Sequence, residues 1–181
     1  RQRSREQELR EQAMRDVLTG IYNKAGEKLI DRMVKEKGQG LFLMLDLNDF
    51  KSINDTMGHA AGDAILTEMG RVLKGACREN DIVARIGGDE FVMFLPGAFD
   101  WQTGKRKIGE IQDSLRTVMI TTWGIRGIRA SIGAALCPED GMDYETLFKA
   151  ADEAMYLDKE QSKNRNESRE AGEEKQDRTI S

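Results

Sequence analysis

Three acidic residues in this chain have the types and positions of a metal-binding group. Asp89 and Glu90 follow a pair of glycines, and Asp46 lies near the end of a short apolar run. Clustered carboxylates repel one another, and hard divalent cations remove that penalty. Mg²⁺ prefers oxygen ligands and is usually shared with substrate phosphates, and two such ions can activate an attacking oxygen and stabilise a leaving one. An Asp-Glu pair at a hairpin is more often a solvated turn, so other motifs must decide between these interpretations.

A polar, glycine-bearing segment runs from the first acid, Asp46, to Asp63. Backbone N–H groups in such a segment can cradle a phosphate. Asn54 and Asp63 can face a guanine edge, because an amide pairs with both donors and acceptors and a carboxylate accepts from the N1 and N2 hydrogens. Lys51 can contact phosphate as a point charge. The segment lacks the Gly-Lys-Ser/Thr signature, so it is not a P-loop.

The histidine and two C-terminal lysines each have two interpretations. His59 is the only histidine, and it can be a hydrogen-bonding residue at a helix start or a catalytic base. Lys159 and Lys163 are four residues apart and share one helix face. Such a pair is usually a solvated stripe, but it can also reach the terminal phosphates of a nucleotide.

Composition narrows the possible partners. The 181 residues include 33% charged residues and carry a formal net charge of -4, which disfavours binding to a nucleic acid polymer.

Cys77 and Cys137 form neither a metal-ligand spacing nor a disulfide framework, so we expect a reducing compartment. No apolar run approaches the roughly 18 residues that span a bilayer, and the N-terminus has no signal-peptide core. We therefore expect a cytoplasmic piece without a membrane segment, which can still be the cytoplasmic domain of a larger sensor or membrane protein.

The apolar pattern alternates between helical and strand-like periods. Short apolar runs on both sides of Gly87-Gly88 predict a hairpin in which glycine supplies a positive φ. The order of elements predicts an α/β (α+β) sandwich, a ferredoxin-like palm with a central mixed or antiparallel sheet flanked by helices. Helices are predicted over residues 25–37, 60–77, 101–119 and 143–163, and strands over residues 41–47, 82–86, 91–95 and 128–136.

The two ends of the chain differ in composition from its centre. Residues 1–15 are dense in Arg, Glu and Gln, which predicts a solvated linker helix. Residues 16–165 form the predicted domain. Residues 166–181 are polar and charged with almost no apolar side chains, which predicts a disordered tail.

Several motifs together resemble the GGDEF family of diguanylate cyclases. The resemblance runs from about residue 15 to residue 164 and keeps the family's order of motifs. The motifs that carry it are Gly87-Gly88-Asp89-Glu90-Phe91 preceded by Arg85-Ile86, Asp16-Val17-Leu18-Thr19-Gly20, the segment from Asp46 to Asp63, Ser131-Ile132-Gly133, and Ala151-Asp152-Glu153-Ala154-Met155-Tyr156.

The resemblance implies a bacterial signalling enzyme with a nucleotide-cyclase-like fold. It would condense two GTP molecules into cyclic di-GMP, release two pyrophosphates, use two Mg²⁺ ions (or Mn²⁺) and act as a homodimer. Asp89 or Glu90 would assist deprotonation of the 3′-hydroxyl. The implied metal ligands are Asp46, the backbone carbonyl of Leu47, Asp89 and Glu90, and the implied substrate contacts are Phe50, Lys51, Asn54, His59, Asp63, Gly88, Lys159 and Lys163.

The family also has a product-inhibition site of the form Arg-x-x-Asp before the signature. Here Arg78-Glu79-Asn80-Asp81 has that pattern and position. An Arg and an Asp three residues apart arise often by chance in so charged a sequence. Arg is nevertheless suited to bidentate contacts with phosphate and to stacking on guanine, so we expect Arg78 and Asp81 to bind the product.

Two departures from the family pattern affect the flanks of the site. Ile21-Tyr22-Asn23-Lys24-Ala25 stands where the family usually has Leu-x-Asn-Arg-Arg, and Ser162-Lys163-Asn164 replaces Gly-Arg-Asn. Lysine keeps the charge of arginine but loses its fork. The alternative functions are a catalytically weak module that senses GTP or cyclic di-GMP, and another nucleotidyl cyclase or polymerase palm. The net charge disfavours the polymerase.

Overall fold

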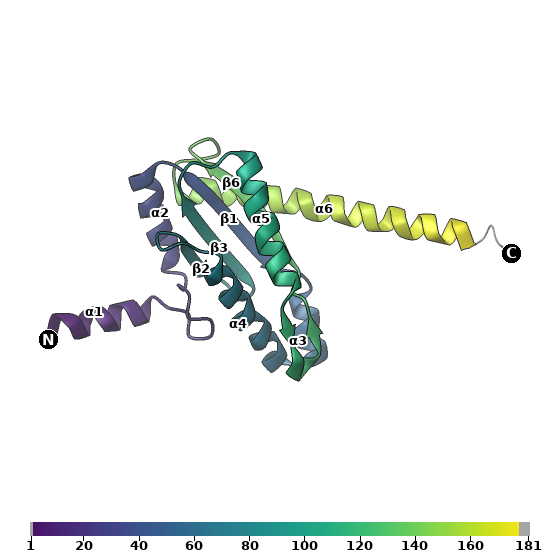
Figure 1. The fold of residues 1–181 in the computed structure, drawn as a ribbon, viewed down its shortest axis with the longest axis horizontal. Coiled ribbons are helices and arrows are strands. Elements are labelled where there is room, and N and C mark those ends of the chain that lie inside the picture. Colours follow the sequence, from purple (N-terminus) through teal and green to yellow (C-terminus); the bar gives the residue numbers. More distant parts are fainter. Residues whose placement is uncertain (1, 178–181) are drawn as a thin grey trace.

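A four-stranded antiparallel sheet forms the centre of the molecule (Figure 1). The structure is a computed structural model that describes residues 2–177. The strand order is β2-β3-β1-β6, and the chain passes through helices between β1 and β2 and again between β3 and β6. This arrangement confirms the predicted ferredoxin-like architecture, with an antiparallel sheet. The strands are β1 (Gly40–Leu47), β2 (Ile82–Arg85), β3 (Glu90–Pro96) and β6 (Ala130–Cys137).

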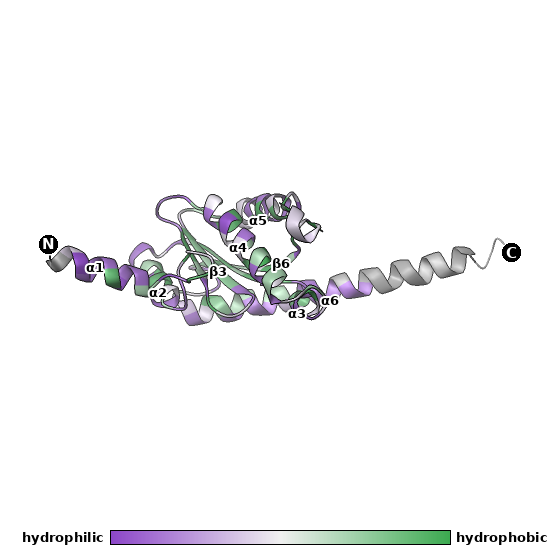
Figure 2. Cartoon of the chain, turned by 90° about the horizontal axis from the view of Figure 1, so that it is seen from below, coloured by the Kyte–Doolittle hydropathy of each residue, from purple (hydrophilic) through white to green (hydrophobic). Residues whose placement is uncertain are grey.

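Alternating side chains of the central strands bury two separate apolar layers. On β1, Leu41, Leu43 and Leu45 face one layer, and Phe42 and Met44 face the other. The first layer packs against α4 (His59–Gly75) and α5 (Trp101–Arg116), and the second against α2 (Gly26–Lys37) and the start of α6 (Tyr144–Asp177). The strands are correspondingly apolar, whereas α1 (Gln2–Ala13) is mostly hydrophilic (Figure 2).

Helix α6 approaches the sheet closely at one glycine. A Cβ atom added to Gly133 on β6 would collide with the backbone carbonyl of Ala151 on α6, so only glycine allows this contact. Ala151 itself is fully buried. The contact fixes where α6 crosses the sheet, and therefore where the lysines further along the helix emerge.

Four predicted features differ from the structure. Helix α6 continues to Asp177 instead of ending near residue 163, because the stretch that was expected to be disordered is rich in strong helix formers; residues 178–181 lie outside the described part. A short helix that was not predicted, α3 (Phe50–Met57), lies within the polar segment between Asp46 and Asp63. Helix α5 ends at Arg116, before the predicted end at residue 119, because the chain next enters a small hairpin made of β4 (Met119–Ile120) and β5 (Ile125–Arg126).

The signature turn is built differently from the prediction. Gly87 and Gly88 do not have the positive φ that was expected. The four residues from Ile86 to Asp89 connect β2 to β3, and the Ile86 N–H donates to the Glu90 carbonyl at 3.0 Å. A longer connection of this kind needs no two-residue turn with mirror-image geometry. A positive φ of 90° occurs instead at Gly58, between α3 and α4.

Within residues 2–177, no helix is both long and apolar enough to cross a membrane.

Candidate active site at the acidic end of the sheet

Strand pairing places two of the predicted acids side by side. Asp46 on β1 is the register partner of Glu90 on β3. Both belong to the strand positions that face α2 and α6, because Met44 and Val92, two residues away on each strand, pack in that layer. The Leu47 N–H donates to the Asp89 carbonyl at 3.3 Å, which ties the signature turn to β1. Sheet register therefore positions this acidic pair.

Asp89 faces Asp46 from the turn. Partial burial raises the pKa of Asp89, and the nearby charge of Asp46 raises it further. One oxygen of Asp46, Oδ1, is buried and has no hydrogen-bond partner. The other, Oδ2, accepts from the Nζ of Lys159 at 2.9 Å. A buried carboxylate oxygen without a partner, beside a second carboxyl group with a raised pKa, favours a cation at this position.

Glu90 has room beside it because residue 87 is glycine. A Cβ atom at Gly87 would lie 3.3 Å from the Oε2 of Glu90. The charge of Glu90 also contributes, after burial and Glu27, to the raised pKa of Tyr144 at the start of α6. Glu90 therefore lies on the face of the sheet that α6 covers.

The donor set fits a divalent cation that is shared with a ligand. Among the described residues, no three His, Cys, Asp or Glu side chains are close enough to hold a metal ion by themselves. Mg²⁺ does not need such a cage, because it is usually bound through one or two carboxylates together with waters and substrate phosphates. Asp46, with Asp89 opposite it and Glu90 alongside, provides the carboxylates, and the backbone carbonyl of Leu47 is the next acceptor on β1.

A second group of predicted residues gathers where α3 meets α4. Asn54 packs over Gly62 so closely that a Cβ atom there would collide with the Asn54 side chain, and the Phe50 ring lies 3.3 Å from the same point. The Oδ1 of Asn54 is buried without a partner. Asp63 follows Gly62 directly and is exposed. The structure therefore brings the amide and the carboxylate of the predicted guanine contacts to one place.

The remaining predicted substrate residues lie at the surface. Lys51 is exposed in the first turn of α3, and His59 is exposed at the first residue of α4. Gly88 is exposed in the signature turn. Lys163 is exposed one turn beyond Lys159 on α6. These placements leave the two lysines, the histidine and the backbone of Gly88 accessible to a ligand.

Arg85 links the signature turn to the segment that follows α1, and the sequence did not predict this link. Its Nε donates to the Gly88 carbonyl at 3.0 Å, and its Nη1 lies 3.1 Å from Asp16. Partial burial opposes ionisation of Asp16, but bonds from the Thr19 hydroxyl and N–H and from Arg85 outweigh it and lower the pKa of Asp16. Both residues belong to motifs noted above, yet their separation of 69 positions hides the contact.

Ser131 supports the loop beside Asp46, and its role was also missed. It is the register partner of Asp46 on β6. Its hydroxyl bonds the Oδ1 of Asn48 at 2.6 Å, and the Asn48 N–H donates to the Arg129 carbonyl at 2.9 Å. Asn48 lies between the acidic end of β1 and α3, so these bonds fix the connection between the two groups of site residues.

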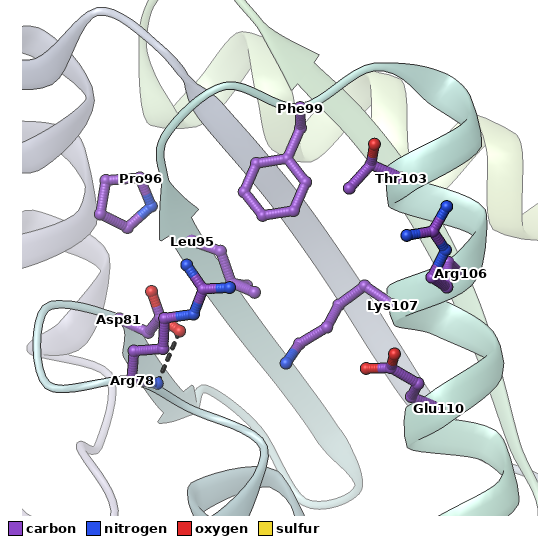
Figure 3. A pocket seen from close by; sticks show the side chains of 9 residues that line it. All are labelled: Arg78, Asp81, Leu95, Pro96, Phe99, Thr103, Arg106, Lys107 and Glu110. Carbon is purple, nitrogen blue, oxygen red and sulfur yellow. Dashed lines mark hydrogen bonds between the residues drawn. The ribbon is translucent and has the colours of Figure 1, made fainter.

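A separate pocket of about 160 Å³ contains the predicted product-binding pair (Figure 3). The Asp81 carboxylate accepts from the Arg78 N–H at 2.7 Å, which closes the turn before β2. Arg106 and Lys107 form the opposite wall from α5, with Phe99 between the two walls (Figure 3). The Lys107 Nζ donates to the Ala76 carbonyl at 2.6 Å and so links α5 to the end of α4. Sequence reasoning found only the Arg78–Asp81 side.

The fold and the site together define a class of protein. It is an α/β sandwich with a ferredoxin-like sheet and carboxylates at one strand end. Comparison with known proteins gives the family. A profile described as "Diguanylate cyclase, GGDEF domain" matches residues 13–165. The chain therefore belongs to the GGDEF-domain family of diguanylate cyclases.

Individual relatives agree with this assignment. Diguanylate cyclase DgcS from Shewanella oneidensis is 33% identical over 165 residues, which cover 87% of this chain and 53% of the relative. Diguanylate cyclase TpbB from Pseudomonas aeruginosa is 34% identical over 161 residues, covering 86% of this chain and 37% of the relative. The chain thus spans about half or less of the length of these relatives.

Solved structures also resemble the chain. The coiled coil and GGDEF domain of DgcB from Caulobacter crescentus, in complex with c-di-GMP, has a TM-score of 0.76 at 27% identity, and the match covers 87% of this chain and 86% of that chain. The isolated GGDEF domain of TpbB from Pseudomonas aeruginosa has a TM-score of 0.75 at 34% identity, covering 81% and 89%.

Proposed function

We propose that this chain condenses two GTP molecules into cyclic di-GMP with release of two pyrophosphates. The observation that carries the proposal is the Asp46–Glu90 register pair with Asp89 facing it from the turn. Bound Mg²⁺ would supply the charge stabilisation and the oxygen activation that phosphoryl transfer needs. The ligands would be Asp46, Asp89, Glu90 and the Leu47 carbonyl.

The protein's own side chains would bind and orient the nucleotide. Asp63 would accept from the N1 and N2 hydrogens of guanine, and the unpartnered amide oxygen of Asn54 would accept a further donor. Phe50 and Lys51 would lie along the triphosphate, Gly88 would let it approach the turn, and His59 would lie near the ribose. The 3′-hydroxyl proton would pass to Asp89 or Glu90.

Two lysines on α6 would hold the terminal phosphates. Lys159 already lies at the acidic end of the sheet, where its ammonium group contacts Asp46. Lys163 is one turn further and exposed. Cations at these positions would neutralise the charge of the departing pyrophosphate.

The product requires two copies of this site. Cyclic di-GMP has two-fold symmetry, and the described residues offer one acidic strand end per chain. A homodimer that places two such sites face to face is the natural catalyst. The rate of product formation per enzyme should therefore rise with enzyme concentration at low concentrations, whereas a constant specific activity over a wide range would contradict the dimer.

We also propose that cyclic di-GMP inhibits the enzyme by binding at Arg78 and Asp81. The pocket there combines cationic side chains from two elements with the Phe99 ring. Guanidinium groups bind phosphate in a bidentate manner and stack on guanine. This pocket lies at the other end of β3 from Glu90, so the inhibitor would not compete directly for the catalytic site.

Product analysis tests the proposed reaction. Incubation with GTP and Mg²⁺ should yield cyclic di-GMP and pyrophosphate in a ratio of one to two, and Glu90→Gln should yield neither. Thermal unfolding of both proteins controls for folding. If the folded wild-type chain binds GTP or cyclic di-GMP but forms no product at any enzyme concentration, it is a sensor module and the catalytic proposal is wrong.

A further inference from the structure

We propose that Lys159 makes metal binding depend on the nucleotide, because its ammonium group competes with a divalent cation for Asp46. This inference rests on the proposed function. It goes beyond that function by assigning Lys159 a role before the phosphates arrive: Lys159 weakens metal binding at the acidic strand end until a triphosphate draws its charge away.

The contact between Lys159 and Asp46 is direct. The Nζ lies 2.9 Å from Oδ2, within both hydrogen-bonding and ion-pairing range. The Asp46 side chain is only 21% exposed and the Lys159 side chain 40%, so solvent screens this pair less than a fully exposed one. The second oxygen of Asp46 is buried and has no partner. Asp46 therefore has one oxygen bound to a cationic side chain and one without any hydrogen-bond partner.

The helix keeps Lys159 at this position. The close contact between Ala151 and Gly133 anchors α6 against β6 eight residues before Lys159. Met155, one turn before Lys159, is buried in the same layer. The ammonium group can leave Asp46 by rotation of its own side chain, but the anchored helix cannot carry it away.

Electrostatics sets the direction of the effect. A divalent cation on Asp46 would lie next to the Lys159 ammonium group, and the two positive charges would repel each other. A triphosphate gives Lys159 another partner with strong charge-assisted hydrogen bonds. Metal and nucleotide should therefore each increase the affinity for the other, and Lys159 should carry part of that coupling.

Mn²⁺ binding measures this coupling without catalysis. The free-ion signal in electron paramagnetic resonance gives the Mn²⁺ affinity with and without a non-hydrolysable GTP analogue. Without nucleotide, Lys159→Met should bind Mn²⁺ about 10-fold more tightly than wild type, the size expected from removing one neighbouring like charge. Adding the analogue should then increase the Mn²⁺ affinity of wild type by a larger factor than that of the variant.

Matched variants separate this effect from net charge. Lys163→Met removes the same charge one turn further along α6, and it should leave the Mn²⁺ affinity without nucleotide within about 2-fold of wild type, because exposed charges are largely screened. In an Asp46→Asn background, Lys159→Met should no longer tighten Mn²⁺ binding. Lys159→Gln serves as a second neutral variant if Lys159→Met does not fold.

The outcomes also distinguish this inference from the proposed function. The inference alone is overturned if Lys159→Met binds Mn²⁺ without nucleotide no more tightly than wild type does. A result in which the two proteins show no measurable difference at any Mn²⁺ concentration counts as that outcome. Failure of the wild-type chain to bind Mn²⁺ even with the GTP analogue overturns the proposed function as well. An equal gain for Lys163→Met would reduce the effect to general charge and would also overturn the inference.

Discussion

The two ends of strand β3 have opposite chemistry. At Glu90 the strand begins among carboxylates, with Asp46 as its register partner. At Pro96 it ends in a pocket whose two facing walls carry Arg78 and Arg106. The seven residues of β3 span six residue steps of extended chain, which separates these ends by roughly 20 Å. Under the proposed function, one strand would support a site that attracts phosphate through a metal ion and a site whose cationic side chains bind phosphate directly.

The two ends are also positioned by different means. Backbone pairing aligns Asp46 with Glu90, so their relation follows from the sheet itself. The basic pocket depends on long side chains that reach toward each other from the turn before β2 and from α5 (Figure 3). One substitution at the acidic end should therefore remove nearly all product formation. Each substitution in the basic pocket should instead remove only part of the affinity for the inhibitor.

The largest effect is expected at the acidic end. Glu90→Gln keeps the shape of the side chain but removes its charge, and it should lower cyclic di-GMP formation at least about 100-fold, the usual range for removing a group that stabilises transition-state charge. Initial rates at saturating GTP and Mg²⁺ measure this. A variant that is folded and retains more than a tenth of the wild-type rate would remove Glu90 from the catalytic group.

The next largest effect is expected in the basic pocket. Arg78→Ala removes a guanidinium group from the turn that Asp81 closes, and it should raise the inhibition constant of added cyclic di-GMP by about 10- to 100-fold, as expected for a lost charge-assisted contact. Lys74→Ala, exposed on the preceding helix, is the matched control. Unchanged inhibition in the Arg78 variant would end the regulatory assignment and leave the catalytic one intact.

The opposite wall of the pocket should contribute less. Arg106→Ala should raise the same inhibition constant by about 3- to 10-fold, because the exposed Arg106 side chain gains a smaller, partly screened contact. Lys105→Ala removes a charge from the neighbouring exposed position on α5, outside the residues that line the pocket, and should have no effect. An effect of Arg106→Ala as large as that of Arg78→Ala would show that both walls bind equally and would break the proposed order.

A smaller effect, on thermal stability, is expected at Asp16, where the segment after α1 contacts the signature turn through Arg85. Asp16→Asn should lower the melting temperature by about 2–4 °C at neutral pH, because it weakens the bonds to Arg85 and Thr19. The pKa of Asp16 lies below its usual 3.8 in the folded chain. Ionised Asp16 therefore stabilises the fold above that pH, and the contribution is lost as the pH falls through the lower folded pKa.

Thermal unfolding from pH 7 to pH 3 checks this prediction. The difference between wild type and Asp16→Asn should be largest near neutrality and shrink toward the acid end. A difference that stays constant across this range would mean that the charge of Asp16 has no part in the effect.

The sequence was informative wherever short apolar runs and local motifs decide structure. The apolar runs of β1 and β3 predicted the strands, and the signature placed Asp89 and Glu90 next to a turn. Such runs cannot give the φ angles of the glycines in that turn, which were wrongly expected to be positive. Those angles follow from the length of the connection, which lies outside any local pattern.

Contacts between distant elements escaped prediction for a related reason. Arg85 bonds Asp16 across 69 positions, and Lys107 bonds Ala76 across 31. Such contacts depend on how helices and strands pack, and many residues in a chain with 33% charged residues could serve equally well. The length of α6 was underestimated because high polarity was interpreted as disorder, although Glu, Lys, Arg and Gln are also good helix formers.

The binding of a metal ion at the acidic end of β1 and β3 can be located directly. Crystals grown with Mn²⁺ and a non-hydrolysable GTP analogue would reveal the ion by its anomalous scattering. We predict a Mn²⁺ peak bridging carboxylate oxygens of this cluster, Asp46 included, to the phosphates of the analogue, with Lys159 turned toward those phosphates. Density for the nucleotide at another place, or a well-ordered nucleotide with no ion in contact with Asp46, would contradict the account.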